Sequence, residues 1–135
     1  MTQGIIAFKP FDATFDSCIA SFFSLVTHRI ELTEAASTSV YSSRHYPVPA
    51  MLIAQLAVDR RYQGSGVGAL TLGHSLWCLA ESSKSVGFEV VLVDAIDPAA
   101  SAFYRKYGFE DLVDGGERLF MTTKDLRRSI KESGE

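Results

Sequence analysis

The stretch VDRRYQGSGVGALTL, Val58–Leu72, sets three glycines between two arginines and a long apolar run. Glycine costs about 0.5–1 kcal/mol inside a helix or strand, so this cluster needs a physical reason. The apolar segment MLIAQLAV at residues 51–58 is typical of a strand that is buried on both faces. Apolar residues at helical spacing then predict a helix from Gly66 to about Ser83. They are Ala69, Leu72, Leu76, Leu79 and Ala80, with Leu70 and Trp77 widening the stripe.

Strand and helix patterns continue to alternate after this stretch. The segment FEVVLVDA, residues 88–95, predicts a second buried strand, and Pro98 begins a helix that runs to about Tyr107. A strand–helix–strand order requires a crossover and therefore a parallel strand pair. Further strands are predicted at residues 4–8, 18–32 and 118–123, and residues 124–135 are a short basic helix or a tail. The fold class is α+β, with a mixed sheet and helices on its faces, in a single domain over residues 1–135.

Three phosphate-binding interpretations of the glycines compete. A P-loop needs a lysine directly after its last glycine, and no lysine follows Gly64 until Lys84. The dinucleotide-binding spacing is met formally by Gly64, Gly66 and Ala69, but the polar segment DRRYQ separates it from the preceding strand. The third interpretation fits best: glycines at the start of a helix let backbone N–H groups approach a pyrophosphate, and the helix dipole attracts it.

Two motifs together resemble the GNAT superfamily of acetyl-CoA-dependent N-acetyltransferases. The block QGSGVG at residues 63–68 is similar to the pyrophosphate loop of that family. The segment AASAFYRKYGF at residues 99–109 is similar to its second signature. Among GNAT proteins, the segment YPVPAMLIAQLAVDRRYQGSGVG and the ending RLFMTTKDL most resemble toxins of bacterial toxin–antitoxin pairs that acetylate aminoacyl-tRNA. The resemblance covers about residues 19–126, with a cofactor-binding core at about 51–110.

The resemblance implies a mixed, largely antiparallel sheet with helices on both faces and a parallel strand pair at the cofactor site. It also implies acetyl-CoA as cosubstrate and Tyr104 as the proton donor to the coenzyme A thiolate, with Tyr107 more suited to packing. The implied cofactor-binding residues are Leu56, Ala57, Val58, Gln63, Gly64, Ser65, Gly66, Val67, Gly68, Ala69, Ala100 and Phe103. From its length we expect the chain to lack the strand and helices that usually begin a GNAT domain, so we expect a homodimer or a partner complex to cover apolar surface.

The acceptor is an amine, and the sequence contains no clear general base. Candidates by residue type alone are His28, Glu31, Glu34 and His45. Deprotonating a lysine of pKa about 10.4 at pH 7 costs roughly 4–5 kcal/mol, whereas an α-amine near 7.7–8.0 costs only about 1 kcal/mol. This favours an α-amine such as that of aminoacyl-tRNA. The resemblance itself implies that the protein is a toxin with an antitoxin partner. Two alternatives stay open: an acetyltransferase for a small amine or a protein N-terminus, and a GNAT-fold module that binds coenzyme A or a partner without catalysis.

The composition and charge of the chain limit which classes of protein it can belong to. The chain is 47% hydrophobic with a net charge of −3, which is not typical of nucleic-acid binding. Local exceptions are Arg60 with Arg61, and a C-terminal cluster of Lys124, Arg127, Arg128 and Lys131. Cys18 and Cys78 form no metal or redox motif and are not expected to pair; no metal site, signal peptide or membrane span is predicted. We expect a cytoplasmic protein with His74 as a packing residue and a core that includes Phe8, Phe11, Phe15, Phe22 and Phe23.

Overall fold

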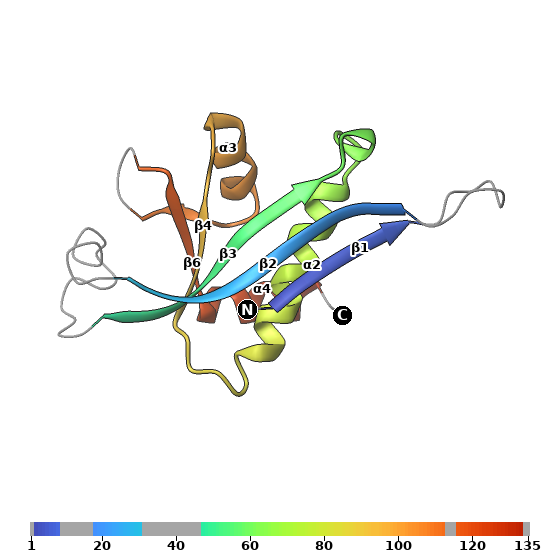
Figure 1. The fold of residues 1–135 in the computed structure, drawn as a ribbon. Coiled ribbons are helices and arrows are strands. Elements are labelled where there is room, and N and C mark those ends of the chain that lie inside the picture. The colour runs from blue at the N-terminus through green and yellow to red at the C-terminus, as the bar shows by residue number, and fades with distance from the viewer. Residues whose placement is uncertain (1, 9–17, 31–46, 113–115, 134–135) are drawn as a thin grey trace.

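The computed structural model describes residues 2–8, 18–30, 47–112 and 116–133 (Figure 1). One sheet contains six strands in the order β1-β2-β3-β4-β6-β5. The strands are β1 (Thr2–Phe8), β2 (Cys18–Ile30), β3 (Val48–Val58), β4 (Val90–Asp94), β5 (Glu110–Asp111) and β6 (Arg118–Thr122). The helices are η1, a short 3-10 helix (Arg60–Tyr62), α2 (Val67–Ser82), α3 (Pro98–Lys106) and α4 (Thr123–Ser133).

Strand pairing confirms the predicted mixed sheet. Neighbouring strands pair antiparallel except β3 and β4, which are parallel and are joined through α2. The helix of residues 123–133 decides between the two predictions made for the C-terminal segment. The short strand β5 was not predicted, because two residues carry no alternation pattern.

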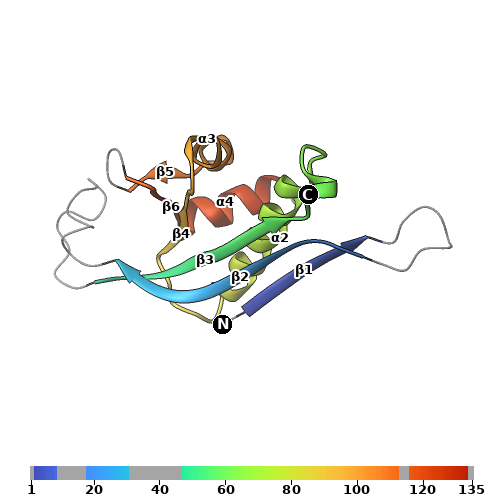
Figure 2. The ribbon, with the colours of Figure 1, turned by 45° about the horizontal axis from the view of Figure 1, so that its top comes forward.

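The three described α-helices lie on the same side of the sheet (Figures 1 and 2). Side chains from α2, α3 and α4 pack into one core cluster with one face of the sheet. Two crossover connections explain this arrangement: α2 connects β3 to β4, and α3 connects β4 to β5. Both connections run in the same direction across the sheet. Right-handed crossovers in one direction place their helices on one face. Helices on both faces were expected; within the described residues they cover one face only.

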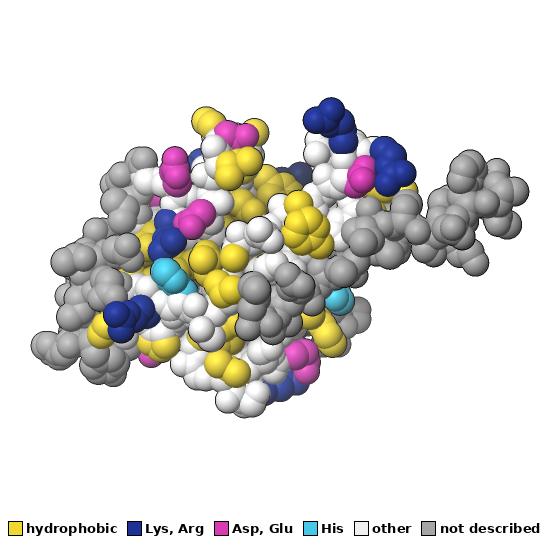
Figure 3. Space-filling view, viewed as in Figure 1, with side chains coloured by type: hydrophobic (Ala, Val, Ile, Leu, Met, Phe, Trp, Pro, Cys, Tyr) yellow, Lys and Arg dark blue, Asp and Glu magenta, His cyan; other side chains and the backbone are white. Residues whose placement is uncertain are grey.

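Strand β4 is buried on both of its sides, as predicted. Val91 and Val93 belong to the cluster beneath the helices, whereas Val90 and Leu92 belong to a second cluster on the opposite face. All four are 0% exposed. This face without a described helix is called the open face below, and Figure 3 looks onto it.

Two expectations about apolar residues are corrected. Phe23 is in the core, but its neighbour Phe22 is 37% exposed, because adjacent residues of a strand point to opposite faces. Leu70 and Trp77 are 53% and 51% exposed, since the side of α2 on which they lie faces away from the core cluster that holds Leu72 and Leu79. Phe11 and Phe15 lie outside the described residues, as does the side chain of Phe8.

Candidate active site

A cleft opens where β3 and β4 stop pairing. The last parallel pair is Ile53 with Val93; β4 then ends at Asp94, while β3 continues to Val58. Among the described residues, the end of β3 therefore has no pairing partner on the β4 side, and its backbone groups there face a cleft of about 350 Å³. Residues that line this cleft include Phe22, Leu56, Ala57, Asp94, Ala100 and Tyr104.

A β-bulge shapes the β3 side of the cleft. Ser24 pairs with Gln55 and Leu25 with Ile53, so Ala54 is the extra residue. Bulges bend a strand and redirect the side chains that follow. After the bulge, Gln55 lies toward the open face, where it accepts a hydrogen bond from Ser24 Oγ at 3.3 Å.

The glycine loop is built as the sequence analysis predicts. Gly64 and Gly66 have φ values of +80° and +89°, which favour glycine. No described atom outside the neighbouring residues lies within 4 Å of a Cβ placed at either position. Gly66 is the N-cap of α2 and gives no side-chain hydrogen bond to the first turn. The N-terminal N–H groups of α2 thus meet open space, as an anion site requires.

Polar side chains around the loop hold its shape. Gln63 Nε2 donates to the Val58 carbonyl at 3.1 Å, and Ser65 Oγ donates to the Tyr62 carbonyl. The side chains of Gln63 and Ser65 therefore stabilise the conformation of the loop. Val67, also predicted at the cofactor, is 5% exposed and packs in the core.

Helix α3 brings the second motif to the same place. Asp97 is its N-cap and accepts a hydrogen bond from the Ala100 N–H at 2.7 Å, with Pro98 in the first turn. A Cβ on Gly68 would lie 3.8 Å from Phe103 Cζ and 3.8 Å from Val58 Cγ2, which is ordinary contact. The start of α2, the end of β3 and the middle of α3 therefore meet.

Tyr104 lies at the centre of this junction. Its ring contacts Phe103 and Phe109 edge to face, with centroids 5.4 and 5.7 Å away. Burial raises the pKa of the Tyr104 hydroxyl above its ordinary value. Among the described residues, this hydroxyl has no hydrogen-bond partner, so it is available to a ligand in the cleft. Tyr107 instead packs its ring on Phe103 at 5.1 Å, which agrees with the packing role expected for it.

The predicted site residues fall into three positions. Leu56, Ala57, Ala100 and Tyr104 line the cleft. Val58, Gly68 and Phe103 meet beside it. Gln63, Gly64, Ser65, Gly66, Val67 and Ala69 form the loop and the first turn of α2.

Arg61 and Arg60 differ in their surroundings. Arg61 Nε donates to Asp59 Oδ1 at 3.0 Å, and these hydrogen bonds hold the pKa of the Asp59 carboxyl below its usual range. Arg60 is exposed in η1.

Of the candidate general bases, only His28 lies among the described residues; its Nε2 is 3.0 Å from Arg118 Nη1. Glu31, Glu34 and His45 lie outside them.

The sequence analysis missed Asp94 and Arg118. They form a bidentate ion pair, with Arg118 Nε and Nη2 at 2.7 and 3.0 Å from the two carboxylate oxygens. The only signal in the sequence was a charged residue directly after the apolar run VVLV. A carboxylate at the end of a buried strand commonly lies beside a site, but its partner 24 residues away was not predictable.

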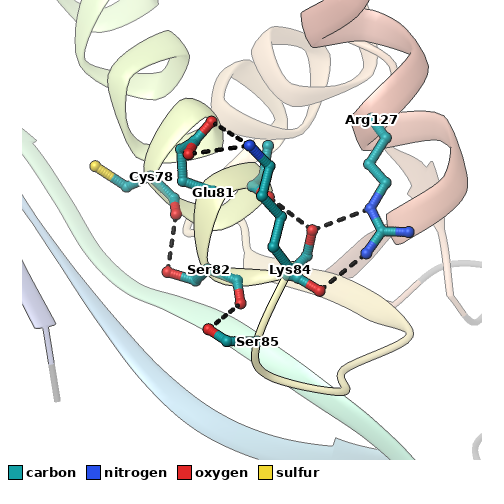
Figure 4. A network of polar contacts seen from close by, with 8 residues as sticks. Cys78, Glu81, Ser82, Lys84, Ser85 and Arg127 are labelled. Carbon is teal, nitrogen blue, oxygen red and sulfur yellow. Dashed lines mark hydrogen bonds and ion pairs between the residues drawn. The ribbon is translucent and has the colours of Figure 1, made fainter.

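The C-terminal basic cluster lies on α4 and is partly structural (Figure 4). Arg127 donates to Ser83 Oγ at 3.0 Å and to the Ser83 carbonyl at 2.9 Å, so it caps the C-terminal end of α2. Arg128 pairs with Asp125 at 3.6 Å. Helix α2 has 16 residues, which places this end about 24 Å from the glycine loop. Arg127 therefore lies far from the glycine loop and takes no part in the cleft.

Among the described residues, the remaining polar side chains form no second site. Cys78 is a free thiol 3.9 Å from His74 Nε2, and burial raises its pKa. The His74 ring packs between Phe23 and Trp77, as a packing residue would. No group of metal-binding side chains occurs in the part of the chain that the structure describes. Within that part, no helix is long and apolar enough to cross a membrane.

Residues 24–111 match the family model described as "Acetyltransferase (GNAT) domain". The chain belongs to the GNAT acetyltransferases. This GNAT chain is 30% identical over 115 residues to the tRNA-acetylating toxin of Mycobacterium tuberculosis, strain ATCC 25618 / H37Rv, with 85% of the chain and 69% of the toxin covered. The resemblance noted from the two motifs is confirmed, and the protein is an acyltransferase related to tRNA-acetylating toxins.

Solved structures of toxin acetyltransferases share the GNAT fold of this chain. A tyrosine-to-phenylalanine mutant of KacT superposes with a TM-score of 0.81 at 23% identity, over 94% of this chain and 74% of KacT. AtaT complexed with acetyl-methionyl-tRNAfMet superposes with a TM-score of 0.71 at 26% identity, over 83% of this chain and 67% of AtaT. AtaT has also been solved with its antitoxin AtaR and acetyl-CoA.

Proposed function

We propose that this GNAT protein transfers the acetyl group of acetyl-CoA to the α-amino group of an aminoacyl-tRNA. One observation carries the proposal: Tyr104, the edge of β3 that β4 does not cover and the open start of α2 converge where β3 and β4 diverge. This arrangement supplies an anion site, backbone hydrogen bonds and a proton donor along one path.

Residues of the chain fit each part of acetyl-CoA. The pyrophosphate suits the N–H groups at the start of α2, because Gly64 and Gly66 leave the approach free of side chains. Residues 56–58 pair with β2 on one side, and the amides of the pantetheine arm suit the backbone groups on their other side, which β4 does not reach, much as a peptide adds to a sheet edge. The small side chains of Ala57 and Ala100 line the cleft between β3 and α3 and leave room for the arm.

Tyr104 supplies the proton that the reaction needs. The amine nitrogen attacks the thioester carbonyl carbon, the carbon–sulfur bond breaks, and the sulfur leaves with the bonding electrons. Tyr104 donates its hydroxyl proton to that sulfur, while the new amide nitrogen loses a proton to solvent. Because burial raises its pKa, the phenol keeps its proton at neutral pH until the sulfur needs it.

The choice of an α-amine rests on proton energetics and on relatives. No described side chain in the cleft is a histidine or glutamate that would act as a strong base. An α-amine needs only about 1 kcal/mol for deprotonation at pH 7, against roughly 4–5 kcal/mol for a lysine. The tRNA-acetylating toxin of M. tuberculosis and AtaT with acetyl-methionyl-tRNAfMet support the same acceptor class.

As further parts of the proposal, the protein works in the cytoplasm as a homodimer and is neutralised by an antitoxin protein. The cytoplasm holds the acceptor, and AtaT with the C-terminus of the antitoxin AtaR is a precedent for the partner. The apolar side chains Leu70 and Trp77 on the outer side of α2 support an interface between chains.

Thiol release from acetyl-CoA tests the function over an acceptor panel of aminoacyl-tRNA, a peptide with a free N-terminus, a lysine side chain and a small diamine. We expect aminoacyl-tRNA to be the best acceptor by kcat/KM. A preference for the peptide or the diamine would assign a different acceptor. Tight coenzyme A binding without thiol release on any acceptor would show a binding module instead.

A further inference from the structure

A carboxylate lies at the edge of the cleft, toward the open face. Asp94 is the last residue of β4 and lines the cleft together with Tyr104. Val90 and Leu92 point to the open face, and alternation along the strand places the Asp94 side chain on that face as well. Figure 3 shows acidic, basic and histidine side chains grouped there beside a patch of hydrophobic ones.

Arg118 fixes the orientation of this carboxylate. The two residues face each other across β4 and β6, and each carboxylate oxygen accepts one guanidinium hydrogen bond. On its other side Arg118 Nη1 contacts His28 Nε2 from β2. An ionised carboxylate has about four acceptor positions, so two remain for another donor.

Fold stability is a weak reason for this pair. The Asp94 and Arg118 side chains are 48% and 26% exposed, and an ion pair of that exposure contributes little to stability. The hydrogen bonds from Arg118 hold the pKa of the Asp94 carboxyl below its usual range. Asp94 therefore stays ionised at neutral pH and accepts hydrogen bonds without taking up a proton.

We infer that Asp94 receives the amino group of the acceptor, on the opposite side of the cleft from the proton donor Tyr104. This inference rests on the proposed acetyl transfer. An amine nitrogen gains positive charge as it attacks a thioester, and a carboxylate that accepts its hydrogen bond stabilises that charge in the transition state. Asp94 thus serves the attacking nitrogen and Tyr104 the leaving sulfur.

The cleft also indicates which acceptors fit. Phe22 and Ile96 line it and are 37% and 88% exposed, so they offer apolar contact to a side chain near the amine. A negatively charged side chain there would face both this apolar wall and the Asp94 carboxylate. The acceptor class is therefore an α-amine with an apolar side chain, and acidic aminoacyl groups are poor acceptors.

Kinetics of Asp94→Asn test the role, with Asp111→Asn as the matched control. Asp111 is also clamped by an arginine, Arg105, at 2.9 and 3.1 Å, but it does not line the cleft. With methionyl-tRNA as acceptor, Asp94→Asn should lower kcat/KM roughly 10–100-fold, the effect of losing a hydrogen bond to a charged group. Acetyl-CoA affinity should hold within twofold in both variants. Equal kinetics of the two variants would overturn the inference.

The wild-type protein provides a measurement that needs no variant. We expect aspartyl-tRNA to be at least tenfold poorer than methionyl-tRNA in kcat/KM. Equal use of the two would contradict the acceptor class.

A binding measurement separates this inference from the proposed function. Methioninamide, titrated into the protein with coenzyme A, should shift the backbone amide NMR signals of position 94 and of Ile96 in wild type and in Asp111→Asn, and not in Asp94→Asn. Binding of this kind without any turnover would uphold Asp94 and reject the acetyl transfer. Turnover that does not depend on Asp94 would reject Asp94 and uphold the transfer. The absence of both turnover and binding would reject the role of Asp94 as well as the acetyl transfer.

Discussion

Tyr104 combines a half-buried ring with a hydroxyl that has no hydrogen-bond partner among the described residues. Such a hydroxyl is free to donate its proton to a bound substrate. Tyr104→Phe keeps the ring contacts with Phe103 and Phe109 and removes only the proton. We expect kcat to fall about 10²–10⁴-fold, the usual contribution of general acid catalysis, while acetyl-CoA affinity holds within a few-fold. Steady-state kinetics and calorimetry measure the two quantities.

Tyr107→Phe is the control for that substitution, because Tyr107 packs on the same Phe103 ring from outside the cleft. It should leave kcat near the wild-type value. The raised pKa of Tyr104 adds an expectation: a group that must be protonated loses function only as pH rises through its pKa, so Tyr104 should cause no fall in kcat below about pH 10. Identical kinetics of the two variants would refute the proton-donor role.

At the scale of elements, the start of α2 depends on the left-handed backbone of Gly66. Asp and Asn adopt this conformation more readily than other residues, so Gly66→Asp and Gly66→Asn should both fold. Gly66→Asp adds a negative charge at the anion site and should abolish coenzyme A binding in calorimetry. Gly66→Asn adds a similar volume without charge and should weaken binding less. If Gly66→Asp bound coenzyme A with unchanged affinity, the assignment of this loop to the pyrophosphate would be wrong.

The junction of α4 with the C-terminal end of α2 depends on Arg127. Removing both of its hydrogen bonds to Ser83 in Arg127→Ala should lower the free energy of unfolding by about 1–2 kcal/mol. Arg128→Ala loses only an exposed ion pair with Asp125 and should change the free energy of unfolding by less than about 0.5 kcal/mol. Urea unfolding measures both, and the same change in the two variants would show that the contact with Ser83 adds nothing.

At the scale of the whole molecule, the outer side of α2 suggests how chains associate. Leu70 and Trp77 are about half exposed on that side, and apolar groups of this kind favour an interface. We expect a dimer by light scattering at micromolar concentration. Trp77 is the only tryptophan, so its fluorescence should shift to longer wavelength as dilution separates the chains. A monomer with emission independent of concentration would contradict the dimer.

Much of the fold was predictable because it follows local rules. The apolar runs of β3 and β4, the helical spacing of α2 and the capped start of α3 each depend on residues within a few positions of one another. Adjacent residues Phe22 and Phe23 were both assigned to the core, because composition alone does not say which face of a strand each one meets. Likewise, the apolar residues of α2 were predicted as one stripe, although Leu70 and Trp77 lie on its outer side.

The sequence by itself determined the glycine loop and the position of Tyr104, because positive backbone angles and a motif of eleven residues are local properties. Only the tertiary structure decided that His28, Asp94 and Arg118 form one cluster beside the cleft. His28 and Arg118 are 90 positions apart in the chain. Their contact depends on the order and register of β2, β3, β4 and β6, which many side chains set together across the sheet and no single segment encodes.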